Sequence, residues 1–232
     1  MDEEARNVVF NPLDREAAID VSARNLPHWF QVGAAIFVTF RTADSLPREV
    51  LLRWHRELTE WLERNGLPVE LADSTVHRHL PNHEQILDSI PVRQRRKFRQ
   101  FSDRMFHCSL DECHGACKLR EPGLAKIVGD AIRFGDGTQY DLDNFIVMPN
   151  HVHAIVQFRQ GSGLEIVSQS WMRFTARRIN SVTGESGAFW QSEPFDHIIR
   201  SSEQFCYLHD YVADNPEKAG LVPTDCLYWH RG

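Results

Sequence analysis

The sequence predicts an α+β fold in which a mostly antiparallel sheet carries helices on one face. Three features point to this class. A strand-like run occupies residues 33–41, two further strand-like runs cover residues 140–148 and 152–158, and segments with helical periodicity lie between and after them. Pro149 and Asn150 lie in the short connection between the two later runs, so we expect these runs to be antiparallel neighbours.

The individual elements follow from local composition. The first strand, residues 33–41, is rich in β-branched and aromatic side chains and is closed by Asp44, Ser45 and Pro47. Helical spacing of apolar residues predicts helices over residues 47–65, 122–134, 164–180 and 202–215, with a short strand at 195–200. Because the residue before a proline disfavours the helical region, Pro216 predicts the end of the last helix at Asn215.

Residues from about 69 to 105 have few hydrophobic repeats but many basic side chains. The cluster consists of Arg93, Arg95, Arg96, Lys97, Arg99 and Arg104. The segment is therefore predicted to be an inserted, partly helical basic element. The basic cluster is either a positively charged surface with a role in binding or simply a solvated helix face, and the sequence favours the two equally.

Composition limits the classes of function. A chain of 232 residues with 42% hydrophobic and 25% charged residues is typical of one main globular domain. No apolar run approaches the roughly 20 residues of a membrane span, and no signal peptide is evident. Five cysteines without a disulfide spacing favour a reducing cytoplasm. The formal net charge of −6 argues against nucleic-acid binding unless positive charge is concentrated locally.

Two histidines stand in the strand that begins near residue 151. Side chains alternate along a strand, so His151 and His153 face the same way while Val152 faces the opposite layer. Two imidazoles at this spacing are good ligands for a divalent ion and leave positions for substrate oxygens. Paired histidines of this kind also occur without a metal, in cores and on surfaces.

The last predicted helix carries Tyr207, Tyr211 and Asn215 four residues apart, which places them in one column of the helix surface. Ordinary packing of aromatic residues and a helix end before proline account for this pattern as well.

Five strings, in this order, resemble the REP-associated tyrosine transposases, which belong to the single-tyrosine HUH transposases of the insertion sequence 200/605 type. They are MPNHVHAIV (148–156), FTARRIN (174–180), FWQ (189–191), FDHIIR (195–200) and YVADNPEKAGLV (211–222). The segments at 28–47 and 110–120 also resemble that family. The likeness runs from about residue 27 to 222, interrupted by the basic insertion.

The resemblance implies a ferredoxin-like sheet domain over residues 27–222, with an insertion at about 48–105, an N-terminal extension (1–26) and a C-terminal tail (223–232). It implies His151 and His153 as ligands of Mg²⁺ or Mn²⁺, Asn215 as third ligand, and Tyr211 as nucleophile. The implied reaction is cleavage and rejoining of single-stranded or hairpin DNA through a 5′-phosphotyrosine, by a cytoplasmic monomer or homodimer.

The helix over residues 164–180 offers groups for DNA contact. Arginines bind phosphates and aromatic rings stack on bases, and the predicted contact residues are Trp171, Arg173, Phe174, Arg177 and Arg178. Two alternatives remain: a two-tyrosine HUH nickase or replication initiator that uses Tyr207 as well, and a hairpin-binding protein without catalysis.

Two other residue groups are weaker candidates for function. Cys108, Cys113 and Cys117 lie near His107 and His114, but their spacing does not match a paired zinc knuckle. His197, in the string FDHIIR, either approaches the catalytic centre or packs at the end of a strand.

Overall fold

The computed structural model describes residues 8–23, 27–76 and 83–232, and these form two compact units. The sheet unit comprises residues up to 23, 27–43 and 118–232, and the helical unit comprises residues 44–117. Parts of the predicted N-terminal extension, residues 1–7 and 24–26, lie outside the described residues.

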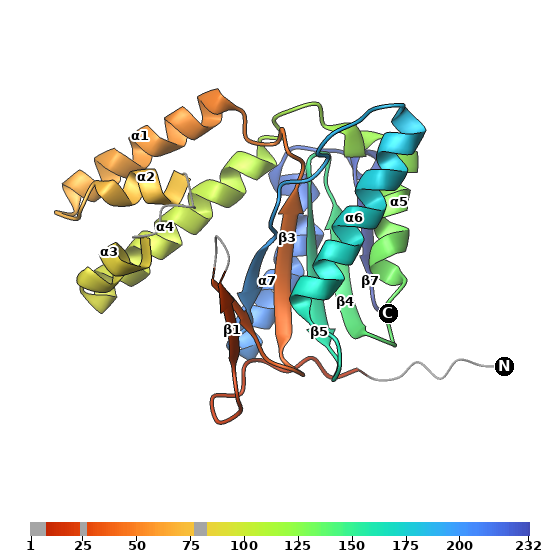
Figure 1. Cartoon of the computed structure of the whole chain (residues 1–232), viewed down its shortest axis with the longest axis horizontal. Helices are drawn as coiled ribbons and strands as arrows, with labels where there is room; N and C mark the ends of the chain where they lie inside the picture. Colours follow the sequence, from red (N-terminus) through yellow and green to blue (C-terminus); the bar gives the residue numbers. More distant parts are fainter. Residues whose placement is uncertain (1–7, 24–26, 77–82) are drawn as a thin grey trace. The chain divides into compact units, whose positions relative to one another are not determined.

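The sheet unit contains seven strands and three α-helices among its described residues (Figure 1). The strands are β1 (Asp20–Ala23), β2 (Pro27–Phe30), β3 (Ala35–Arg41), β4 (Tyr140–Val147), β5 (His151–Phe158), β6 (Phe195–Ile198) and β7 (Leu227–His230). The helices are α5 (Pro122–Arg133), α6 (Leu164–Thr183) and α7 (Ser202–Lys218). β1 and β2 form a separate two-stranded sheet.

The central sheet has the strand order β6-β3-β5-β4-β7, and every neighbouring pair is antiparallel. The predicted α+β class with an antiparallel sheet is therefore confirmed. The two runs around Pro149 and Asn150 pair as expected, and the register places Thr39 of β3 and Ile146 of β4 opposite His153 of β5.

Helices cover both faces of this sheet, so the prediction of helices on one face is wrong. Figure 1 shows α6 and α7 on opposite sides of the strands. On one face Val152 and Val156 join an apolar cluster with residues of α5 and α6; on the other, Ile155 joins a smaller cluster with Val212 of α7. A central strand with apolar residues on both faces needs cover on both sides, which periodicity over one helix at a time does not reveal.

The predicted C-terminal tail contributes an edge strand. β7 pairs with β4, with Trp229 opposite Phe145 and Tyr228 opposite Ile146. Helix α5 approaches this strand closely at Gly129, where an added Cβ would lie 2.5 Å from Leu227 Cδ2. A larger residue at this position would require the Leu227 side chain to move.

Helix α7 runs past its predicted end. It begins after Ser201, whose hydroxyl accepts a hydrogen bond from the Gln204 amide at 3.2 Å, a typical N-cap. It continues through Pro216 to Lys218, and Gly220 follows with φ of +65°. A proline in the last turn removes only one helical hydrogen bond, so burial of the preceding turns outweighs the local preference for an end at Asn215.

The helical unit contains α1 (Arg48–Arg64), α2 (Glu70–Val76), α3 (His83–Ser89) and α4 (Val92–Asp111). The basic cluster lies on α4, a continuous helix of 20 residues that buries Phe98 and Phe106. Arg95 bonds to Asp88 and to the Ile90 carbonyl, so this member links α3 to α4. No helix within the described ranges is long and apolar enough to cross a membrane.

Candidate metal and nucleophile site

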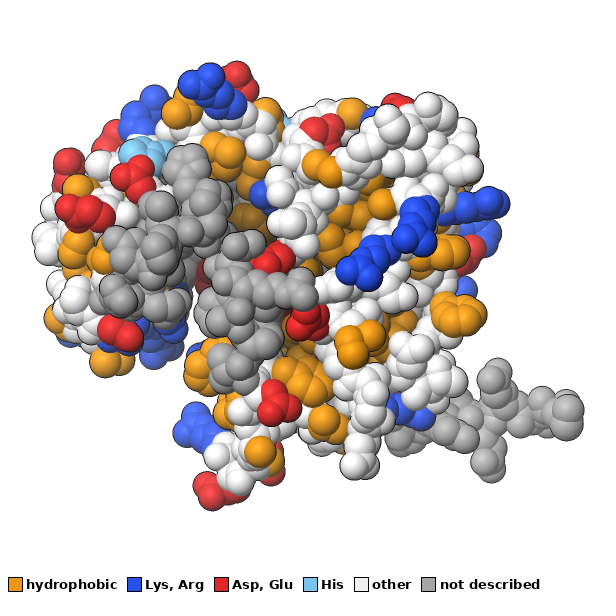
Figure 2. Space-filling model, viewed as in Figure 1, with side chains coloured by type: hydrophobic (Ala, Val, Ile, Leu, Met, Phe, Trp, Pro, Cys, Tyr) orange, Lys and Arg blue, Asp and Glu red, His pale blue; other side chains and the backbone are white. Residues whose placement is uncertain are grey.

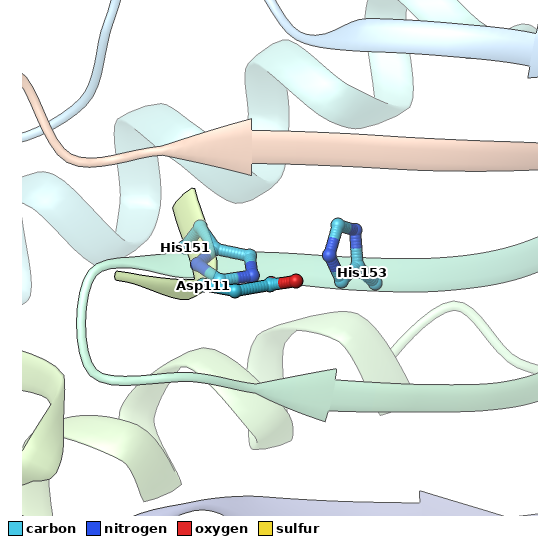
Figure 3. A group of neighbouring side chains, drawn as sticks. All are labelled: Asp111, His151 and His153. Atoms are coloured by element: carbon cyan, nitrogen blue, oxygen red, sulfur yellow. The ribbon is translucent and has the colours of Figure 1, made fainter. Parts of the chain in front are cut away.

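The two histidines of β5 lie side by side on the face of the sheet that α7 covers. Both are fully buried, and their ring centroids are 4.6 Å apart with an interplanar angle of 70° (Figure 3). Asp111, which Figure 3 also labels, belongs to the helical unit. The sheet unit thus supplies two imidazoles at one end of its central strand.

Hydrogen bonds to Nδ1 orient both rings. The Nδ1 of His151 is 2.7 Å from Asn150 Oδ1; because an amide oxygen only accepts, His151 carries its proton on Nδ1 and presents the Nε2 lone pair. The Nδ1 of His153 is 2.7 Å from the Thr39 hydroxyl, which is able to accept a hydrogen bond from the same tautomer. Metal-binding histidines show this arrangement, in which an oxygen holds the second ring nitrogen. The donor set therefore fits a divalent cation.

The sequence analysis did not predict that Asn150 and Thr39 bind the two histidines, although a feature of the sequence points to each of them. Asn150 lies in the tight connection between the two strands and directly precedes His151. Thr39 is a polar residue inside an apolar strand, and the strand register places it opposite His153. Its identity as the partner required knowledge of which strand pairs with β5.

Tyr211 of α7 packs against the same site. Its ring centroid is 5.4 Å from that of His153 and 6.1 Å from that of Phe37, both edge-on. The ammonium of Lys218 lies 4.9 Å from the Tyr211 ring centroid and 3.8 Å from Asp214 Oδ2. The side chain of Tyr211 is thereby held between the sheet and the last turn of its own helix.

Asn215 and Tyr207 flank Tyr211 by one helical turn on either side. Asn215 is fully buried and, with Val212, forms the inner side of α7. Tyr207 is 67% exposed, and its ring lies 6.4 Å from that of Tyr211 at an interplanar angle of 23°. The two tyrosines therefore have different environments: Tyr211 faces the histidines and Tyr207 faces solvent.

His197 of β6 is paired in register with Phe37 of the neighbouring strand β3, on the face of the sheet that α7 covers. Its Nε2 accepts a hydrogen bond of 2.6 Å from the Gln204 amide nitrogen. Burial, with a smaller contribution from the positive charge of Arg200, lowers the pKa of His197 to about 4. A neutral imidazole hydrogen-bonded to α7 fits a packing role in joining β6 to that helix.

The predicted DNA-contact residues divide into two groups. Trp171 is 4% exposed, belongs to the core between α6 and the sheet, and donates from Nε1 to the Tyr140 hydroxyl at 3.1 Å. Its predicted role in stacking on bases is therefore wrong, because its ring faces the core. Phe174, by contrast, is 57% exposed on the outer side of α6.

The outer side of α6 forms a shallow basic hollow of about 760 Å³. Its lining consists of Ile166, Gln169, Ser170, Arg173, Phe174, Arg177, Arg178 and Ser181. Figure 2 shows a diagonal row of basic side chains over this helix. Positive charge is therefore concentrated locally in a chain of net charge −6, on the face of the sheet opposite the histidines.

The cysteine-rich segment lies in the helical unit. Among the described residues Cys108, Cys113 and Cys117 form no disulfide bond, and the Cys117 thiol donates a hydrogen bond to the Cys113 carbonyl at 2.7 Å. Within the part of the chain that the structure describes, they do not gather three metal-ligating atoms.

Comparisons with known proteins give two likenesses. No protein-family model matches the sequence. The chain is 25% identical over 99 residues to an uncharacterized protein of Haemophilus influenzae, in a match covering 34% of this chain and 55% of that protein. The chain thus spans about half the length of the curated relative it matches.

The second likeness is structural. The fold resembles a solved structure of a REP-associated tyrosine transposase bound to a REP hairpin, with 15% identity and a TM-score of 0.41. The match covers 84% of this chain and 73% of the other.

Proposed function

We propose that this protein is a metal-dependent DNA transesterase that cleaves and rejoins single-stranded or hairpin DNA, with Tyr211 as the nucleophile. The observation that carries the proposal is the packing of the Tyr211 ring 5.4 Å from the His153 ring, beside two buried imidazoles whose Nδ1 atoms both form hydrogen bonds to oxygen atoms. The combination of a phenol next to a two-histidine donor set suits nucleophilic attack on a phosphate.

His151 and His153 would hold one divalent cation, with Asn215 as the third protein ligand. When bound, Mg²⁺ or Mn²⁺ supplies a Lewis acid that polarises a phosphate oxygen and orients the phosphate for in-line displacement. Hydrogen bonds from the two Nδ1 atoms to Asn150 and Thr39 would leave both Nε2 lone pairs available to that cation. These buried oxygens act as positioning groups.

The reaction exchanges one phosphoester bond for another. The Tyr211 oxygen forms a bond to phosphorus while the bond from phosphorus to the 3′ oxygen breaks, so the 5′ end of the strand becomes attached to the protein. The phenol loses one proton and the departing 3′ oxygen gains one, which leaves a free 3′-hydroxyl. Because bond types are conserved, attack by a 3′-hydroxyl reverses the step without an external energy source.

On DNA contacts, we propose that Arg173, Arg177, Arg178 and Phe174 bind the strand outside the cleavage site, through phosphates and base stacking. The hollow that they line contains no carboxylate, which favours an anionic partner. Because α6 and α7 cover opposite faces of the sheet, a bound DNA would pass around a sheet edge to reach both.

The remaining sequence predictions belong to the same proposal. They are a catalytic domain over residues 27–222 with an insertion at about 48–105, a cytoplasmic location, and a monomer or homodimer.

The environments of the two tyrosines favour a single nucleophile over the two-tyrosine alternative. Tyr211 contacts the His153 ring, whereas Tyr207 is 67% exposed one turn away. A hairpin-binding protein without catalysis would not need a phenol beside two oriented imidazoles.

The proposal is tested by adduct formation. The purified protein is incubated with a pool of single-stranded hairpin DNA and Mn²⁺, and covalent protein–DNA adducts are scored on a denaturing gel. We expect an adduct that EDTA prevents and that added Mn²⁺ restores. Tyr211→Phe removes only the attacking oxygen and should form none, while Tyr207→Phe should form it normally. An adduct of normal yield with Tyr211→Phe would disprove the assignment.

A further inference from the structure

Tyr207 is an exposed aromatic side chain directly beside the proposed nucleophile. Two thirds of its surface is accessible, and its ring is inclined by only 23° to that of Tyr211 at 6.4 Å. The rings are one helical turn apart on α7, so the helix fixes their spacing. Tyr207 thus extends the aromatic surface of the site towards solvent, and its ring plane is nearly parallel to that of Tyr211.

The charges around this ring select the kind of group that it would bind. Asp210 and Asp214 lie on the same helix, and Lys218 pairs with Asp214 at 3.8 Å. Carboxylates repel a second phosphate but not an uncharged ring. Nucleobases are uncharged, flat and polarisable, and they stack on aromatic side chains irrespective of sequence.

We propose that Tyr207 is a nucleobase-stacking site that positions the nucleotide next to the scissile phosphate. The inference deepens the proposed function and rests on it for the position of that phosphate. A base stacked on Tyr207 would tether the strand within one helical turn of the Tyr211 oxygen. It also gives the second tyrosine of the column a role that needs its ring and not its hydroxyl.

Binding of single-stranded DNA in a Tyr211→Phe background tests this inference without cleavage. An end-labelled oligonucleotide without secondary structure is titrated in Mg²⁺, both intact and with a single abasic site moved along the strand. Tyr207→Phe keeps the ring, and Tyr207→Leu keeps an apolar side chain but removes the ring. Phe134→Leu is the matched control, because Phe134 is 87% exposed at the end of α5, which packs on the other face of the sheet.

We expect Tyr207→Leu to weaken binding by about tenfold, the effect of removing one base–aromatic stack. Tyr207→Phe and Phe134→Leu should bind like the parent protein. At one position of the scan, the abasic site should weaken DNA binding by the parent protein but not by Tyr207→Leu. The leucine variant has already lost the stacking interaction that the missing base would remove. Equal affinity of the leucine and phenylalanine variants, or additive effects at every abasic position, would overturn the stacking role.

The adduct assay separates this inference from the proposed function. If the wild type forms no adduct but Tyr207→Leu still binds more weakly than the parent and is insensitive to the abasic site at one position, the stacking site stands and the proposed chemistry fails. If the adduct forms and Tyr207→Leu binds normally, the chemistry stands and the stacking site fails. Loss of strand rejoining in Tyr207→Phe, with the first cut intact, would make Tyr207 a second nucleophile and refute a ring-only role.

Discussion

The two faces of the central sheet differ in what β5 contributes to each. Towards α5 and α6 the strand presents Val152, Ala154 and Val156, all fully buried in a large apolar cluster. Towards α7 it presents His151 and His153, which are equally buried. Burying an imidazole costs free energy unless protein hydrogen bonds replace those made to water, whereas burying valine is favourable. One face therefore stabilises the fold, and the other carries polar groups whose retention needs a functional reason.

This difference predicts that substitutions on the two faces have separable effects. Changes on the α7 face should reduce chemistry more than stability. Changes on the α5 and α6 face should reduce stability and leave chemistry intact in the molecules that remain folded.

The largest effect is expected for His153→Ala. Removal of one imidazole should slow adduct formation at saturating DNA by about 1000-fold, because the cation that would stabilise charge on the reacting phosphate loses one of its proposed ligands. It should also weaken Mn²⁺ binding, measured by calorimetric titration without DNA. A variant that keeps normal Mn²⁺ affinity and a normal rate would remove the α7 face from the mechanism.

The next effect concerns the apolar face. Leu142 of β4 is fully buried in the cluster with α5 and α6, and Leu142→Ala should lower the free energy of unfolding by about 3 kcal/mol through reduced burial and a cavity. Urea denaturation measures this change. Adduct formation, corrected for the folded fraction, should stay within about twofold of wild type. A large specific decrease in rate would show that the two faces are coupled.

His197 gives a pH dependence on the α7 face. Its folded-state pKa of about 4 is below the unfolded value of 6.5, so the unfolded chain binds the proton more tightly between these values. The stability contribution is complete above pH 6.5 and is lost as the pH falls towards 4, by roughly 2 to 3 kcal/mol. His197→Gln should flatten this part of the stability profile, measured by urea denaturation at several pH values. Profiles of equal slope would contradict the burial of a neutral ring.

The smallest effect is expected on the outer side of α6. Arg177→Gln with Arg178→Gln should weaken single-stranded DNA binding and reduce the slope of log K against log salt by about 0.7 for each phosphate that the protein no longer neutralises. Lys126→Gln on α5 is the control, because Lys126 is paired with Asp130. The rate of adduct formation at saturating DNA should not change. A salt slope that the double variant leaves unchanged would exclude this surface from DNA binding.

The errors in the sequence-based predictions share one cause, which is that local spacing does not show which side of a helix is buried. Trp171 and Phe174 are both aromatic residues of one amphipathic helix, yet one contacts the core and the other contacts solvent. Periodicity located α6 but did not show which of its sides meets the sheet. Similarly, Pro216 predicted a helix end that the burial of Val212 and Asn215 overrides.

Local patterns were sufficient for β3 to β6 and for α5 to α7, but not for β1, β2 and β7. They were also sufficient for the shared orientation of His151 and His153, because backbone geometry alone makes side chains alternate along a strand. This alternation does not determine which strand pairs with β5 or which helix packs on its face. The pairing of β3 with β5 brings Thr39 to His153, and the packing of α7 on that face brings Tyr211 to the same ring. Both contacts join residues more than 50 positions apart, so they depend on chain topology and burial, which no local spacing encodes.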